Sequence, residues 1–66
     1  MIEICLSNRA FCHIKMENYG LALADADLAI KYNVSFAKAY YRKGIAYLLL
    51  SKLDEAKNSF NMANKL

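Results

Sequence analysis

The sequence predicts an all-α chain of four antiparallel helices arranged as two helix-turn-helix repeats. The composition supports helices, because the 66 residues contain no Pro and 58% are hydrophobic, too many for a disordered chain. Apolar side chains recur at three- and four-residue intervals, the spacing of one helix face. A shift of the sequence by 34 residues places small residues on small ones and bulky residues on bulky ones.

The repeat is visible in side-chain size more than in residue identity. Small residues coincide at five pairs of positions: Cys5 with Ala39, Ala10 with Gly44, Cys12 with Ala46, Ala22 with Ala56, and Ala29 with Ala63. Bulky residues coincide at Leu6 with Tyr40, Ile14 with Leu48, Tyr19 with Leu53, and Leu28 with Met62. Small residues at fixed places let helices approach closely, and bulky ones fill the remaining space. We therefore expect one domain, residues 1–66, with repeats at about 3–36 and 37–66.

Each repeat divides into two helices at a polar interruption. The expected helices run from about Ile2 to Lys15, from Tyr19 to about Tyr32, from about Phe36 to Leu50, and from Leu53 to the end. Asn18 has the residue type of an N-cap for the second helix. Residues 34–41 and 44–50 contain strand-forming side chains but do not alternate, which excludes a hairpin of strands. All turns are short, so neighbouring helices are expected to be antiparallel.

Charge and hydropathy exclude several classes of function. Nine Lys and Arg against six Asp and Glu give a net charge of +3. This small excess is compatible with an acidic peptide partner, but it is only weak evidence for a nucleic-acid partner. The longest apolar run, Ile45–Leu50, is far shorter than the roughly 20 residues of a membrane span. The amino terminus does not resemble a signal peptide. We expect a cytoplasmic protein, also compatible with the nucleus, with no nucleic-acid or membrane partner.

No constellation in the sequence predicts an active site, a cofactor or a metal. Cys5 and Cys12 lie seven residues apart on one helix, roughly 10 Å between α-carbons, too far for a disulfide; we expect small core residues. His13 has no partners at metal-ligand spacing. Asp25 and Asp27 point in different directions on a helix, which favours a solvated face or a salt bridge to a neighbouring repeat. We do not expect this segment to be an enzyme.

The residues that predict a binding site lie at the start of the third helix. Lys38 and Arg42 are four residues apart and share a helix face. An Arg fork can grip a carboxylate through two hydrogen bonds, a Lys adds a mobile charge, and the amide of Asn8 can donate without charge. Phe11 and Ile14, one and nearly two turns beyond Asn8, are candidates for an apolar wall. The alternative is a solvated cationic face, since like charges four apart repel.

The 34-residue period and its size pattern resemble the tetratricopeptide repeat (TPR) over essentially the whole chain. The second repeat carries the residue types of the family at Tyr40, Gly44, Tyr47, Ala56, Phe60 and Ala63. The first matches more loosely, at Leu6, Ala10, His13, Ala22, Ala26 and Ala29. Arg9 and Lys43 stand where the family usually has Leu, and Val34 where it usually has Pro. The resemblance implies a short right-handed superhelical solenoid.

A narrower resemblance concerns the polar residues. TPR co-chaperones use an Asn in one repeat, with a Lys and an Arg in the next, as a two-carboxylate clamp. The clamp binds the Glu-Glu-Val-Asp terminus of heat-shock chaperones. Asn8, Lys38 and Arg42 occupy these places, and SNRAF, LADADLAI and KAYYRKG are similar to the repeats of type five serine/threonine phosphatases.

This resemblance implies an interaction module, the adaptor part of a co-chaperone or of such a phosphatase. Its partners would be chaperones of the ninety- or seventy-kilodalton class. The family's clamp also uses a Lys and an Asn from a preceding repeat, which have no counterpart here, so the resemblance implies part of a longer TPR domain.

A different class of function stays open from the sequence. Helical repeats need about three copies for stability, and two copies leave apolar ends without a neighbour. Under this alternative hypothesis, the chain is a structural piece of an array, and its apolar ends mediate self-association. These ends lie around Ile2, Leu6, Phe60 and Leu66.

Overall fold

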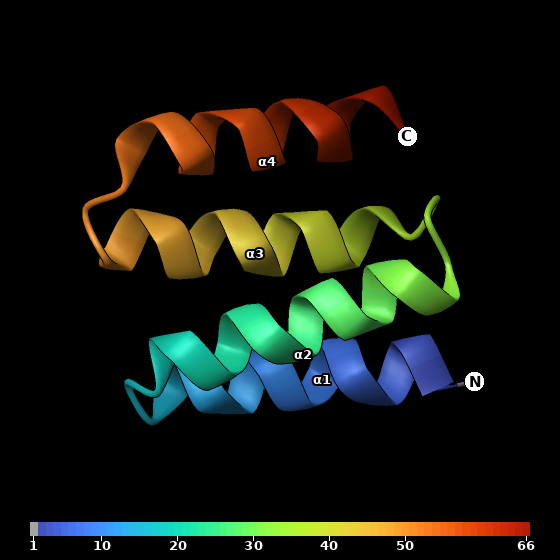
Figure 1. The fold of residues 1–66 in the computed structure, drawn as a ribbon, viewed down its shortest axis with the longest axis horizontal. Coiled ribbons are helices and arrows are strands. Elements are labelled where there is room, and N and C mark those ends of the chain that lie inside the picture. The colour runs from blue at the N-terminus through green and yellow to red at the C-terminus, as the bar shows by residue number, and fades with distance from the viewer. Residues whose placement is uncertain (1) are drawn as a thin grey trace.

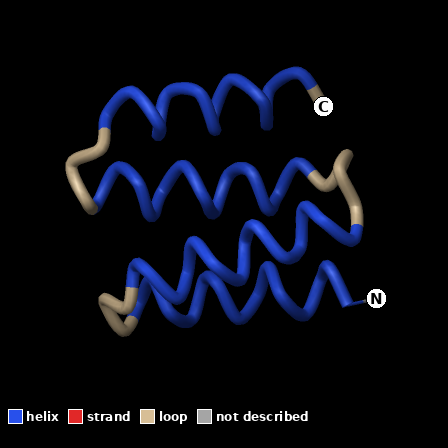
Figure 2. Tube along the Cα trace, viewed as in Figure 1, coloured by secondary structure: helices blue, strands red, loops and turns tan. Residues whose placement is uncertain are grey.

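The computed structural model describes residues 2–66 as four antiparallel helices. They are α1 (Ile2–Lys15), α2 (Tyr19–Tyr32), α3 (Ala37–Leu49) and α4 (Leu53–Lys65). The helices follow one another across the molecule, and both chain ends lie at the same side (Figure 1). Short loops join them, and no strand occurs in residues 2–66 (Figure 2). The predicted all-α hairpin architecture is confirmed, with Phe36 and Leu50 capping α3 rather than lying inside it.

The molecule is a thin slab of 30 × 26 × 13 Å. The slab is thin because consecutive helices lie beside each other and do not form a closed bundle (Figure 1). Within residues 2–66, no helix combines the length and the apolar character needed to cross a membrane.

The turns inside the two hairpins have the same geometry, which supports the 34-residue repeat. Glu17 and Ser51 both adopt the left-handed conformation, with φ of 63° and 62°. The next backbone N–H in each turn donates to a carbonyl five residues earlier, from Asn18 to His13 at 2.8 Å and from Lys52 to Tyr47 at 2.9 Å. This is the hydrogen bond that closes a Schellman motif at a helix carboxyl end.

Asn18 precedes α2 as expected, but its side chain does not cap the helix. The backbone of Asn18 is already used on both sides: its N–H closes the end of α1, and its carbonyl accepts the Ala22 N–H at 3.0 Å. The side chain is exposed. The prediction of a side-chain N-cap is therefore wrong, and the turn is held by main-chain hydrogen bonds.

The core consists of small side chains at the places where the helices pack. Five alanines are 0% exposed: Ala10, Ala26, Ala29, Ala39 and Ala46. The largest side chain that is fully buried is that of Ser7. One cluster joins Leu6, Ala29 and Ala39, and a second joins Ile14, Ala22 and Ala46. Each cluster takes one residue from α1, α2 and α3, so α2 connects the two hairpins. Leu6, which we expected at an open end, belongs to this core.

The Phe60 ring of α4 occupies the space beside Gly44 of α3. A Cβ at Gly44 would lie 2.6 Å from the Phe60 ring, closer than packed atoms tolerate. The corresponding pair in the first hairpin is Ala10 and Ala26, both fully buried. The two hairpins thus fill the same space with different pairs, glycine with phenylalanine and alanine with alanine.

The prediction that Cys5 and Cys12 are core residues is wrong, because both are exposed free thiols. Their counterparts in the second repeat, Ala39 and Ala46, are buried because α2 packs on that face of α3. Within residues 2–66, no helix packs on the matching face of α1. The side-chain size therefore indicates the type of contact but not whether a neighbour is present.

We predict that Glu17→Gly stabilises the fold by about 0.5–1 kcal/mol. A left-handed non-glycine residue costs roughly 1–2 kcal/mol, and the greater freedom of glycine in the unfolded chain offsets part of the gain. Urea unfolding followed by circular dichroism measures the change. Glu17→Gln removes the charge but keeps the cost of the left-handed backbone at this position, and we expect it to change the stability little. Equal stability of the Gly and Gln variants would contradict this explanation.

Candidate functional site

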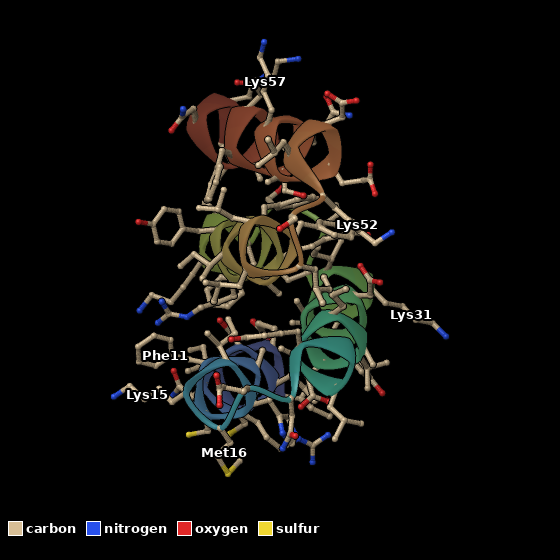
Figure 3. All side chains as sticks on the ribbon, turned by 90° about the vertical axis from the view of Figure 1, so that its left-hand side faces the viewer. Phe11, Lys15, Met16, Lys31, Lys52 and Lys57 are labelled. Carbon is tan, nitrogen blue, oxygen red and sulfur yellow. The ribbon has the colours of Figure 1, made fainter. Side chains whose placement is uncertain are left out.

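Four of the five predicted binding residues lie on neighbouring faces of α1 and α3, and Ile14 does not. These two helices contact each other and run in the same direction, because each is antiparallel to α2 (Figure 1). Asn8, Phe11 and Lys15 share one strip of α1 by their three- and four-residue spacing, and Lys38 with Arg42 form the facing strip of α3. We call these five residues the α1–α3 face. Phe11 and Lys15 project on the side opposite Lys31 of α2 (Figure 3).

Phe11 is the residue that connects the two strips. The Arg42 guanidinium carbon lies 4.2 Å from the centroid of the Phe11 ring, and the Lys15 Nζ lies 4.8 Å from it. Both distances are those of cation–π contacts. Phe11 thus lies on the expected face, but its ring contacts two cations and is not a free apolar wall. Lys15, four residues beyond Phe11 on the same strip, was missed by reasoning from the sequence.

Arg42 is half-buried and makes no hydrogen bond or ion pair with any of residues 2–66. Its Nε is shielded from solvent and has no acceptor. A buried donor without a partner costs roughly 1–3 kcal/mol. The Arg42 guanidinium thus lies over the Phe11 ring, and an external acceptor would have to bind the terminal Nη atoms, because Nε is shielded.

Asn8 and Lys38 lie about one helical turn before Phe11 and Arg42 on their helices, and both are exposed. Neither makes a side-chain hydrogen bond or an ion pair to the rest of the described chain. The structure thus brings Phe11 and Arg42 into contact, while Asn8 and Lys38 are exposed about one turn earlier on the same two helices. Residues 2–66 enclose no pocket, so this site is an open surface.

Ile14 does not belong to this face. It is 8% exposed and packs with Ala22 and Ala46, with Tyr19, Leu23 and Ile45 around them. Ile14 follows Ala10 by four residues, so it lies on the side of α1 that meets α2 and α3. Its assignment to the wall of the site is therefore wrong, because six residues correspond to a rotation of about 120° around the helix from Asn8.

Asp25 neutralises one of the remaining cations within the first hairpin. Its two carboxylate oxygens accept hydrogen bonds from Arg9 Nε and Nη2, both at 2.8 Å, and His13 Nε2 lies 3.4 Å away. The hydrogen bonds from Arg9 hold the pKa of Asp25 below its usual value, although burial opposes them. Asp25 is 7% exposed and pairs within its own repeat, so neither expectation, a solvated face or a salt bridge to a neighbouring repeat, holds for Asp25, whereas the salt bridge to a neighbouring repeat is confirmed for Asp27.

Asp27 and Lys43 form the ion pair between the two repeats, 2.8 Å apart. Burial lowers the pKa of Lys43, but the hydrogen bond and the charge of Asp27 outweigh burial and raise it above the usual value. Arg9 and Lys43 are equivalent by the 34-residue shift, and each pairs with an aspartate of α2. The cations left without an acidic partner near the α1–α3 face are therefore Lys15, Lys38 and Arg42.

The chain is similar in sequence to several known proteins. No protein-family profile matches the chain. It is 36% identical over 63 residues to the Hsp70/Hsp90 co-chaperone CNS1 of Saccharomyces cerevisiae, covering 96% of the chain and 16% of that protein. It is 47% identical over 53 residues to serine/threonine-protein phosphatase T of Trypanosoma brucei brucei, covering 80% of the chain and 11% of that protein. The chain thus spans about a sixth or less of these relatives.

A solved structure matches the fold over nearly the whole chain. It is the second TPR of Spaghetti (RPAP3) bound to the HSP90 peptide SRMEEVD, with a TM-score of 0.91 and 36% sequence identity. The match covers 97% of this chain and 56% of that one. The likeness therefore extends to all four helices and to more than a third of the residues.

We predict that Asp25→Asn destabilises the fold by about 1–2 kcal/mol at pH 7. The cost stays below that of a fully buried pair because the Arg9 side chain is 61% exposed. The folded-state pKa of Asp25 is lowered, so its contribution is present above the unfolded pKa of about 4 and is lost as pH falls through the folded pKa. Urea unfolding from pH 7 to pH 2 measures this.

The matched control is Asp27→Asn, which removes the exposed carboxylate of the Asp27–Lys43 pair. We expect it to cost at most about 0.5 kcal/mol. A difference between wild type and Asp25→Asn that persists unchanged at pH 2 would contradict the role of the ionised carboxylate.

Proposed function

The chain is a pair of tetratricopeptide repeats of the co-chaperone type, and on that premise we propose that its α1–α3 face binds the acidic carboxyl terminus of a heat-shock chaperone. The ligand class is a peptide that ends in Asp with glutamates before it. This would make the segment a protein-interaction module with no catalytic role, the adaptor of a co-chaperone or of a serine/threonine phosphatase.

The observation that carries the proposal is the state of Arg42. Its guanidinium is fixed on the Phe11 ring and has no acidic partner in the described chain. Three positive charges at one open surface, without a nearby carboxylate, favour an anionic ligand. Arg42 can take a carboxylate through two parallel hydrogen bonds, Lys38 adds a charge, and Asn8 donates from its amide. The RPAP3 repeat with 36% identity was solved with a peptide of this kind.

The expected affinity is modest. Charge-assisted hydrogen bonds contribute roughly 1.5–3 kcal/mol each, and association consumes several kcal/mol of that. Two or three such bonds correspond to a dissociation constant on the order of 1 mM. Tighter binding would need more contacts than these residues offer.

The exposed free thiols of Cys5 and Cys12 suit a reducing compartment, so we propose a cytoplasmic location, also compatible with the nucleus.

We predict that Arg42→Ala weakens the peptide acetyl-Met-Glu-Glu-Val-Asp by more than tenfold. Titration of labelled protein, followed by nuclear magnetic resonance, measures dissociation constants in this weak range. Lys31→Ala is the matched control, because Lys31 projects on the opposite side (Figure 3) and loses the same charge. We expect the amidated peptide to bind wild type more weakly than the free acid. Equal binding of both peptides, or unchanged affinity of Arg42→Ala, would refute the proposal.

We predict that Phe11→Leu weakens the free-acid peptide by about two- to fivefold, because it removes a cation–π contact of roughly 0.5–1 kcal/mol from Arg42. Phe11→Trp keeps an aromatic face and should retain the affinity. The same titration compares the three proteins. If Leu and Trp have equal effects, the aromatic ring does not position Arg42.

A further inference from the structure

Two consecutive cations of α3, Arg42 and Lys43, connect this helix to the two helices of the first hairpin. The Arg42 guanidinium carbon lies 4.2 Å from the centroid of the Phe11 ring of α1. The Lys43 Nζ lies 2.8 Å from a carboxylate oxygen of Asp27 of α2. Consecutive side chains of a helix point about 100° apart, so the two contacts leave α3 in different directions. Two such contacts restrict the rotation of α3 about its own axis.

The apolar contacts beside Lys43 do not specify this rotation as sharply. Lys43 lies between Ala39 and Ala46, at four- and three-residue spacing, so the three residues share the strip of α3 that meets α2. Both alanines are fully buried, but burial of a methyl group is favourable without regard to direction. Asp27 and Lys43 form the ion pair that joins the two hairpins within residues 2–66. On this strip, the ion pair is therefore the contact that depends on direction.

The surroundings of Lys43 favour a charged and localised ammonium group. The side chain of Lys43 is 25% exposed, and that of Asp27 is 55% exposed. The hydrogen bond and the charge of Asp27 keep the pKa of Lys43 above its usual value although burial lowers it. The Lys43 Nζ also lies 6.0 Å from the centroid of the Tyr47 ring, at the limit of a cation–π contact. The ammonium group thus has an acidic partner in the first hairpin and an aromatic neighbour in the second.

We propose that Asp27 and Lys43 are positioning residues for the peptide site, because their ion pair sets the rotation of α3 that keeps Arg42 on Phe11. The α1–α3 face takes residues from both hairpins, so it exists only in the correct arrangement of the two. In this role Asp27 and Lys43 act through Arg42 and not on the peptide itself. The effect on binding rests on the proposed function, whereas the effect on Arg42 is measurable without a peptide.

The test uses Asp27→Asn, for which positioning and simple electrostatics predict opposite effects. The variant raises the net charge of +3 by one unit, and charge alone would leave an acidic peptide bound equally or more tightly. If the pair positions Arg42, acetyl-Met-Glu-Glu-Val-Asp instead binds about two- to fourfold more weakly, the range that a partly exposed ion pair contributes. Glu55→Gln of α4 is the matched control, because it makes the same charge change outside the pair. Asp27→Glu keeps the carboxylate and should retain the affinity.

A second measurement follows the Arg42 side chain in the free protein. Protons over an aromatic ring are shielded by its ring current, so the nuclear magnetic resonance signals of Arg42 report its place over Phe11. We expect Asp27→Asn to lose part of this shift and Asp27→Glu to keep it. Unchanged Arg42 signals in Asp27→Asn, or binding as tight as that of Glu55→Gln, would overturn the inference. If the wild-type chain binds the free-acid and amidated peptides equally, the proposed function fails, and the Arg42 signals alone decide whether the pair positions this side chain.

Discussion

The close approach of helices at small residues is the constraint on which this structure depends. Most fully buried positions are alanines, and no side chain larger than that of Ser7 is completely buried. At Gly44, the Phe60 ring leaves no room for a Cβ atom. Backbones that lie this close gain dispersion contacts along whole helices but leave no room for bulky residues between them. The large side chains are displaced to the edges of the slab, and this displacement places Phe11 and Arg42 at the surface, where they meet.

The sequence predicts the features that recur every 34 residues. Helix ends, the hairpin turns and the small residues at Ala39 and Ala46 follow from periodicity and size, since each is a local consequence of the chain itself. The exposure of Cys5 and Cys12 does not follow, because it depends on whether a neighbour is present. Ile14 was misassigned for a different reason: it follows Asn8 by six residues, a rotation of about 120° around the helix, so it shares the core side with Ala10 and not the side of Asn8.

Side-chain pairing was the other part that the sequence left open. Arg9 and Lys43 are equivalent positions, yet one pairs within its hairpin and the other between hairpins. The difference follows from a single position in the second helix of each repeat, where Asp25 corresponds to Ser59. Asp25 holds Arg9 inside its own hairpin, while Ser59 offers Lys43 no charge. Within residues 2–66, Lys38 and Arg42 have no acidic partner, which maintains the positive character of the α1–α3 face.

The glycine–phenylalanine contact in the second hairpin has a consequence for how similar repeats avoid confusion with each other. If α1 paired with α4, the methyl group of Ala10 would take the place of the missing Cβ at Gly44, 2.6 Å from the Phe60 ring. If α3 took the place of α1 in the first hairpin, Gly44 would face Ala26 and leave a void. The first non-native pairing would cause a steric clash, and the second would leave a cavity. The size complementarity of Gly44 and Phe60 therefore disfavours incorrect pairing between the similar helices of the two hairpins.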